Sequence, residues 1–367
     1  MTNKRQLMIL LSVFLVFGIT VIGAASADSA SPDMGESAGK ADDTAGSPWL
    51  FIPMLSSDPK VGTSGGAMAG YLFKLDPDST SSMVGAGATY STTDSLLGAI
   101  FLRSFWDNDS RRLTGGVGGG KIENDYEDFL ESGLPAQITD TLKVALIRYL
   151  QEFTPGWLGG VQGTYTNYLI SSEDFEIQEI LKALGLTGVD SIGLGLVAMY
   201  DDRDNQNSPR SGRKFLFDNL AYRESFGGEE NFDTYNMQFN QYIPHGERNV
   251  LAYRIVGRWT HNAEPGAYSS VNLRGYVRGQ YLAPHSTMIE VEERMHIKGR
   301  FGLNVFAGAA CLYGDDRSCS DSENWYTSIG IGGQVLINKS ENMTMTFDLA
   351  NGEGSNYGFY MRFGQAF

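Results

Sequence analysis

Arginine, glycine and tyrosine recur in the stretch VNLRGYVRGQY, residues 271–281. Its two Arg-Gly pairs, Arg274-Gly275 and Arg278-Gly279, are four residues apart. Such a string could bind nucleic acid, capture a small anion, or clamp carboxylates inside a fold. The chain has a formal net charge of −15 at pH 7, and an acidic protein is poorly suited to a phosphate backbone. We therefore expect no nucleic-acid partner.

Other motifs with chemical potential are incomplete. GGVGGGKI (115–122) fits the start of a phosphate-binding loop, but Ile122 stands where that loop needs Ser or Thr. DDRDNQNSPRSG (201–212) lacks the spacing of a calcium loop and its terminal Glu, and is better interpreted as a turn. The four histidines are scattered, and no G-x-S-x-G is present. We expect no enzymatic activity, no metal and no cofactor.

The elements that must position these residues alternate apolar and polar side chains with period two. In NVLAYRIVGRWT (249–260), Tyr253 and Ile255 share one face, while Arg254 and Arg258 share the other. Sixteen such segments follow one another, most of them about ten residues long, which is the length needed to cross a membrane as a tilted strand. They lie near 48–55, 62–74, 80–91, 95–106, 111–123, 138–152, 156–170, 188–201, 211–224, 231–243, 248–261, 286–298, 300–313, 324–338, 341–351 and 356–367.

The connections between these segments favour a closed barrel over a soluble sandwich. Short turns such as DPDS (76–79) and DNDS (107–110) alternate with longer loops, notably 124–137, 171–187 and 262–285. Short turns at one end and long loops at the other are typical of outer-membrane barrels, with the short turns in the periplasm. We predict an all-β fold, a 16-stranded antiparallel transmembrane β-barrel over residues 48–367.

The N-terminal residues predict export. Lys4 and Arg5 precede an apolar run over 7–22, and Ala25-Ser26-Ala27 provides small residues for cleavage. This order is typical of a secretory signal peptide, here residues 1–27, although an uncleaved anchor is the alternative. Residues 28–47 are small and acidic, and we expect a disordered periplasmic linker. Together with the barrel, these segments predict a location in the outer membrane of a Gram-negative bacterium.

Two smaller features complete the prediction. Residues 171–187 carry apolar side chains at helical spacing, so a helix capping the barrel is expected there, with an inserted strand as the alternative. Cys311 and Cys319 are the two cysteines, and in an exported protein they could close a small loop as a disulfide or remain two thiols.

Four motifs in this order resemble one family, the BamA/TamA-type superfamily of bacterial surface antigen barrels, over about residues 48–367. LRGY (273–276), RGQY (278–281) and MIEVEER (288–294) are similar to its sixth extracellular loop and following strand. DDRDNQNSPRSG is similar to its D-x-R-D-N…P-x-x-G periplasmic turn, at Asp202, Arg203, Asp204, Pro209 and Gly212. PMLSSDPKVGTSGG (53–66) is similar to its opening hairpin, and YMRFGQAF (360–367) to its terminal strand, with Phe359, Met361, Phe363 and Phe367 as the terminal strand signal.

The resemblance implies a latch inside the lumen. In the family an arginine of the loop meets a glutamate of the next strand, which here implies Arg274, Gly275 and Tyr276 in the loop and Glu292 and Arg294 on the strand. Alternation supports this, because Glu292 and Arg294 share the polar face of that strand. The sequence departs from the family at VFAGAAC (305–311), which keeps Phe306 but lacks the acid that often gives the loop arginine a second partner.

The function implied by the resemblance is to assist insertion or passage of a protein or lipid at the outer membrane, through a seam between the first and last strands. The chain resembles a member without the periplasmic POTRA domains, since about twenty linker residues precede Trp49. The expected partners are outer-membrane lipids and the cell's barrel-assembly machinery, which would insert this chain. A separate periplasmic partner that supplies client binding is a further possibility, testable by co-purification in mild detergent. The alternative function is a passive pore or structural surface antigen.

Overall fold

The structure is a computed structural model that describes residues 47–58, 62–126, 136–183, 188–264, 267–276, 280–339, 342–354 and 356–367. The signal peptide predicted at 1–27 lies outside the described residues, as does the predicted linker except for residue 47. Arg278 and Gly279 of the second Arg-Gly pair also lie outside them.

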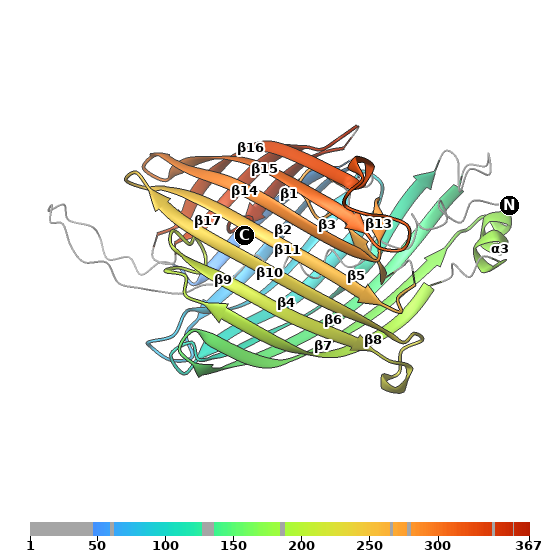
Figure 1. Cartoon of the computed structure of the whole chain (residues 1–367), viewed down its shortest axis with the longest axis horizontal. Coiled ribbons are helices and arrows are strands. Elements are labelled where there is room, and N and C mark those ends of the chain that lie inside the picture. The colour runs from blue at the N-terminus through green and yellow to red at the C-terminus, as the bar shows by residue number, and fades with distance from the viewer. Residues whose placement is uncertain are drawn as a thin grey trace, which may run out of the picture.

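Sixteen antiparallel strands form a closed barrel, which confirms the predicted fold (Figure 1). Strands consecutive in the barrel are hydrogen-bonded neighbours, and the first pairs with the last. The strands are β1 (Trp49–Asp58), β2 (Gly62–Phe73), β3 (Ser82–Ser91), β4 (Leu96–Trp106), β5 (Arg111–Tyr126), β6 (Ala136–Thr154), β7 (Trp157–Ser171), β8 (Gly188–Asp201), β9 (Gly212–Tyr222), β10 (Phe232–His245), β11 (Asn249–His261), β14 (His285–Lys298), β15 (Phe301–Tyr313), β16 (Trp325–Asn338), β17 (Met343–Asn351) and β18 (Tyr357–Phe363).

The remaining elements lie in the connections. β12 (Ser269–Ser270) and β13 (Leu282–Ala283) form a small separate sheet within the long connection between β11 and β14. Two short 3-10 helices cover Glu224–Phe226 and Ser322–Asn324. Among the described helices, none is long and apolar enough to cross a membrane.

The predicted helix is confirmed as α3 (Phe175–Ala183). Its first turn is capped by the Asp174 carboxylate, which accepts the backbone N–H groups of Glu176 at 2.8 Å and Ile177 at 3.2 Å. Its apolar side chains join a cluster at one end of the barrel, consisting of Leu97, Ile122, Ile138, Leu142, Tyr168, Ile170, Ile177 and Leu181. We call this end, where the odd-numbered strands up to β11 finish, the loop end, and the opposite end the turn end.

Alternation divides the barrel wall into an outer and an inner face. The outer face carries exposed apolar side chains around the barrel, among them Phe51, Ile100, Val117, Ile147, Val161, Leu196 and Ile329. Aromatic pairs lie on it near the turn end, with ring centroids 5.0 Å apart for Trp49 and Tyr71 and 5.2 Å for Trp157 and Tyr200. An apolar outer band bordered by aromatic residues is the surface that a bilayer requires of a spanning barrel.

Candidate functional site: a luminal latch beside an incomplete seam

The connection between β11 and β14 folds back into the barrel. Val271 and Leu273 are buried against Met288 of β14 and against Ala310 and Leu312 of β15. These inward-facing side chains form one apolar cluster with the loop. The cluster fixes the loop against the inner face of two strands and places the next residue, Arg274, in the lumen.

Arg274 lies among three carboxylates from two strands. Its Nη1 atom is 2.6 Å from Glu292 Oε2 and 3.0 Å from Asp348 Oδ2, while its Nη2 contacts Glu290 Oε1. Arg274 is 5% exposed, and the three acids are buried. Charge-assisted hydrogen bonds of this kind are strong where water is largely excluded.

Three further arginines share the same carboxylates. Arg254 Nη2 donates to Glu290 at 3.2 Å, Arg294 Nε donates to Glu292 at 2.7 Å, and Arg362 Nη1 is 3.4 Å from Asp348. Each acid therefore meets two guanidinium groups, which compensates for its removal from water. We call this set of four arginines and three acids the latch network: Arg254, Arg274, Arg294, Arg362, Glu290, Glu292 and Asp348.

The partners of Arg274 differ in part from those implied by the family motif. Glu292 is in contact, and Glu290 lies one inward position before it on the same strand. The third acid, Asp348, comes from β17. β15 contributes an aromatic ring, because the Arg274 guanidinium lies 3.3 Å above the centre of Phe306. Glu293 points to the outer face, where its Oε1 is 2.7 Å from His245 Nε2.

Gly275 and Tyr276 connect the loop to the strands near the seam. Gly275 has φ 98°, and a Cβ there would lie 2.9 Å from the backbone nitrogen of Gly352, so the close approach requires glycine. Its N–H donates to the Tyr360 hydroxyl at 3.0 Å. The Tyr276 hydroxyl donates to the Thr327 carbonyl at 2.8 Å and accepts the Glu353 N–H at 2.9 Å. The three motif residues thus contact β14, β16, β17, β18 and the β17–β18 connection.

The predicted turn motif forms the connection between β8 and β9. Asp204 accepts the N–H groups of Arg210 and Ser211 at 2.9 and 3.1 Å, and Gly212 turns the chain with φ 93°.

In the same turn, Arg203 donates to both oxygens of Asp201 at 2.7 and 2.9 Å. Burial acts to lower the pKa of Arg203, but the Asp201 carboxylate outweighs it and the pKa lies above its usual value. Asp202 accepts the Arg213 N–H at 2.6 Å, and Pro209 belongs to the same turn.

The last strand is shorter than the segment expected from sequence, which ran to Phe367. β18 ends at Phe363, and Gly364, with φ 89°, turns the chain into the lumen. The Phe367 carbonyl accepts a hydrogen bond from Arg294 Nη2 at 2.7 Å, and its ring packs with Tyr242, Val250 and Ala252. Phe359, Met361 and Phe363 lie on the outer face, whereas Phe367 lies inside the barrel. The C-terminal end accordingly falls within the outline of the barrel in Figure 1.

The first strand has few paired positions with the last. Within the described residues, β1 and β18 are paired at two positions, Ser56 with Tyr360 and Ser57 with Phe359. In contrast, β1 pairs with β2 along its full length. Residues 49–55 therefore have no paired strand on the β18 side, and the seam is closed by a ladder only near the loop end.

Buried methionines close the rest of the seam. Leu349 of β17 faces outward and is 58% exposed. Met345 and Met343 lie on the same face of the strand, nearer the turn end. They are nevertheless only 9% and 3% exposed. Protein atoms must therefore cover the outer face of β17 at this end.

The side chains that cover β17 come from the inner face of β1–β4. Leu50 and Ile52 lie on the inner face of β1, opposite the exposed Trp49 and Phe51, and they belong to the same packed cluster as Met343. The inner face of β1–β4 thus overlaps the outer face of β17–β18. We call this the lapped joint, formed by Leu50, Ile52, Met54, Met68, Leu72, Met83 and Phe101 against Ile337, Met343, Met345, Phe347, Met361 and Phe363.

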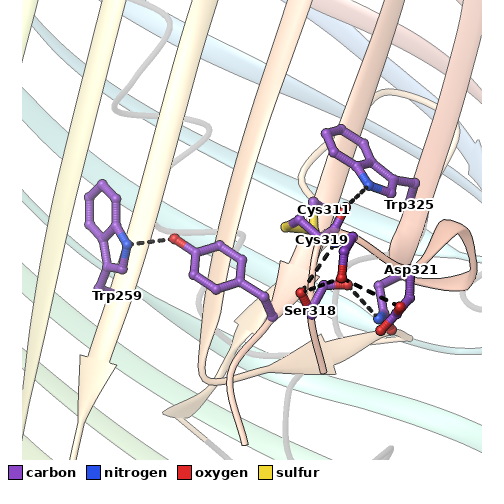
Figure 2. The surroundings of a disulfide bond; sticks show 9 residues. Trp259, Cys311, Ser318, Cys319, Asp321 and Trp325 are labelled. Carbon is purple, nitrogen blue, oxygen red and sulfur yellow. Dashed lines mark hydrogen bonds between the residues drawn. A yellow bond between two sulfur atoms is a disulfide. The ribbon is translucent and has the colours of Figure 1, made fainter. Parts of the chain in front are cut away.

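A disulfide fixes the loop end between β15 and β16. Cys311 on β15 is bonded to Cys319 in the following connection, with Cα atoms 5.9 Å apart. Figure 2 shows the bond beside Trp325, whose Nε1 donates to the Cys319 carbonyl at 2.8 Å. Trp259 of β11 lies across β14 from it and donates to the Tyr313 hydroxyl at 2.7 Å. These contacts support the wall against which the latch loop packs.

Solved structures with a similar barrel include one BamA and two CdiB proteins. BamA from Haemophilus ducreyi lacking POTRA domains 1–3 aligns with a TM-score of 0.53 at 12% identity, over 87% of this chain and 70% of that one. CdiB from Escherichia coli aligns with a TM-score of 0.55 at 10% identity, over 98% and 71%. CdiB from Acinetobacter baumannii aligns with a TM-score of 0.55 at 11% identity, over 85% of this chain and 59% of that one.

These alignments show that the chain has the barrel fold of BamA and CdiB. The resemblance drawn from the loop motif is therefore confirmed at the level of the fold. Neither a protein-family model nor a curated protein matches the sequence. At such low identity the likeness carries the fold alone, so activity has to be argued from the latch and the seam.

Proposed function

We propose that this barrel assists the insertion or passage of a protein or lipid at the outer membrane of a Gram-negative bacterium, through the seam between β1 and β18. The turn end would face the periplasm and the loop end the exterior. The observation that carries the proposal is the incomplete seam. Among the described residues, paired positions join the two strands at Ser56–Tyr360 and Ser57–Phe359, while an apolar overlap closes the seam toward the turn end.

An opening at this seam would cost less than opening any other interface of the barrel. A complete antiparallel ladder hides backbone N–H and C=O groups that a bilayer cannot satisfy. Here residues 49–55 of β1 already lack a ladder on the β18 side. The opening would separate two paired positions and slide the lapped joint apart. A path from the lumen to the lipid then follows from the strand topology.

Locking the seam tests this proposal. Ser57→Cys and Phe359→Cys are Cα partners across β1 and β18, so their disulfide would hold the seam closed. The purified chain in lipid vesicles should accelerate the folding of an unfolded eight-stranded barrel client, measured by heat-modifiable gel migration. We expect the oxidised lock to abolish the acceleration and a reductant to restore it.

The matched control places the same second cysteine in an interior pair. Leu349→Cys and Phe359→Cys join β17 to β18 and leave the seam free. Both variants keep Cys311–Cys319, so any effect of the reductant on that bond is common to them. Equal acceleration by the locked and control variants would contradict passage through the seam.

A passive pore is the alternative function, and the latch loop disfavours it. The loop enters the lumen and is held by the latch network against the inner face of β14–β18, which narrows the route along the barrel axis. In planar bilayers we expect a mostly closed protein with brief openings. A steady, large conductance from the unmodified chain would instead identify a pore.

A further inference from the structure

A second group of charges lies in the lumen at the turn end, apart from the latch network. Arg112 of β5, Arg148 of β6 and Lys214 of β9 face inward, and Arg203 of the β8–β9 turn joins them. Two carboxylates, Asp201 and Asp218, lie among these four cations. This gathering of basic side chains stands out in a chain whose formal net charge is −15.

Both carboxylates of this group accept hydrogen bonds from residues other than Lys214. Asp201 Oδ2 accepts from Arg112 Nη1 at 3.0 Å, and both of its oxygens accept from Arg203. Asp218 accepts from Arg148 at 3.3 Å and from the amides of Gln162 and Asn236, each at 3.0 Å. Every oxygen of the two acids therefore already accepts at least one hydrogen bond.

Lys214 is the cation left over. It is paired with Asp201 across the β8–β9 ladder, so their Cβ atoms are neighbours, and it shares the inner face of β9 with Asp218. Nevertheless, its ammonium makes no hydrogen bond or ion pair with any residue that the structure describes. The nearby Glu152 carboxylate is also engaged, because it accepts the Gly156 N–H at 2.7 Å.

We propose that Lys214, together with Arg112 and Arg148, binds a phosphate group that enters the lumen from the turn end. A phosphate group would supply anionic oxygens for the Lys214 ammonium and for the unused N–H donors of the two arginines. A guanidinium group has five N–H donors, so both arginines retain donors beyond those used on the carboxylates. Phosphate accepts several such charge-assisted hydrogen bonds at once.

The test measures phosphate binding by the purified full-length chain in detergent. Thermal unfolding is followed by heat-modifiable migration while inorganic phosphate is titrated at constant ionic strength, with chloride as the balancing anion. The unfolding temperature should rise saturably with phosphate, because a ligand of the folded state stabilises it. Lys214→Gln should raise the half-saturating concentration about tenfold or more, since a hydrogen bond to a charged group is lost. Lys214→Arg should retain binding.

Lys143→Gln is the matched control, because Lys143 lies on the outer face of β6 and loses the same charge away from the lumen. An equal response of Lys214→Gln and Lys143→Gln would overturn the proposal, as would equal stabilisation by chloride. A parallel titration with dioctanoyl phosphatidic acid identifies the source of the group. A response to this lipid alone would assign a lipid headgroup, a response to inorganic phosphate a free anion, and a response to neither would refute the site.

Discussion

Replacing Arg274 by alanine should destabilise the barrel by about 3–5 kcal/mol, which is typical of removing one partner of a buried ion pair. The change would leave Glu290, Glu292 and Asp348 close together and buried, with one shared cation removed. The Phe306 ring would also lose the guanidinium above it. Thermal unfolding followed by heat-modifiable migration measures the loss. Protease digestion should show a loosened loop in a barrel that still inserts.

Charge compensation distinguishes the latch from simple packing. If repulsion among the acids left without Arg274 causes the loss of stability, adding Glu290→Gln and Asp348→Asn to Arg274→Ala should recover part of that stability. Arg274→Lys should be intermediate, because a lysine keeps the charge without the fork that reaches two strands.

Arg111→Ala is the control for removing an arginine as such. Arg111 pairs with Asp107 at 3.3 Å on an exposed turn, and an exposed pair contributes less than about 1 kcal/mol. If Arg274→Ala matches Arg111→Ala in stability and loop protection, the loop is held by the apolar cluster of Val271 and Leu273 alone.

Much of this site could be anticipated because strand alternation assigns faces without knowledge of the fold. The polar face of the β14 segment placed Glu292 and Arg294 in the lumen. Alternation does not say which luminal residues meet. Asp348 reaches Arg274 from β17 because the loop lies along the inner face of β14–β18. That contact depends on how far the loop extends over neighbouring strands, which no local pattern encodes.

The end of the last strand was mispredicted for a related reason. YMRFGQAF alternates to its final aromatic residue, and a continued strand would keep Phe367 on the wall. In the structure, Gly364 bends the chain so that the Phe367 carbonyl meets Arg294. The partner is 73 residues away in sequence and belongs to the latch network, so the turn is a tertiary effect. Because Ser56 pairs with Tyr360, the turn leaves residues 49–52 of β1 with no strand opposite them.

The second large effect is expected at the lapped joint. The double variant Met343→Ala and Met345→Ala should loosen the seam at the turn end. Truncating a buried methionine to alanine costs about 2–5 kcal/mol per site, through lost apolar burial and the cavity left behind. The measurement is the rate and yield of disulfide formation between Ser57→Cys and Phe359→Cys when these substitutions are added to the double variant. We expect slower or incomplete crosslinking, because the strands would spend more time apart.

Leu349→Ala provides the contrast that makes the result interpretable. It shortens an apolar side chain on the same face of the same strand, but one that is exposed where Met343 and Met345 are covered. Because Leu349 faces lipid, truncating it replaces side-chain contacts with lipid by other lipid contacts, and crosslinking should be unchanged. Equal behaviour of the two variants would mean that nothing covers the methionines. The two paired positions would then have to hold the seam alone, and an opening would need no sliding of one sheet over the other. A difference between them would instead show that apolar overlap, rather than backbone pairing, sets the resistance of this seam to opening.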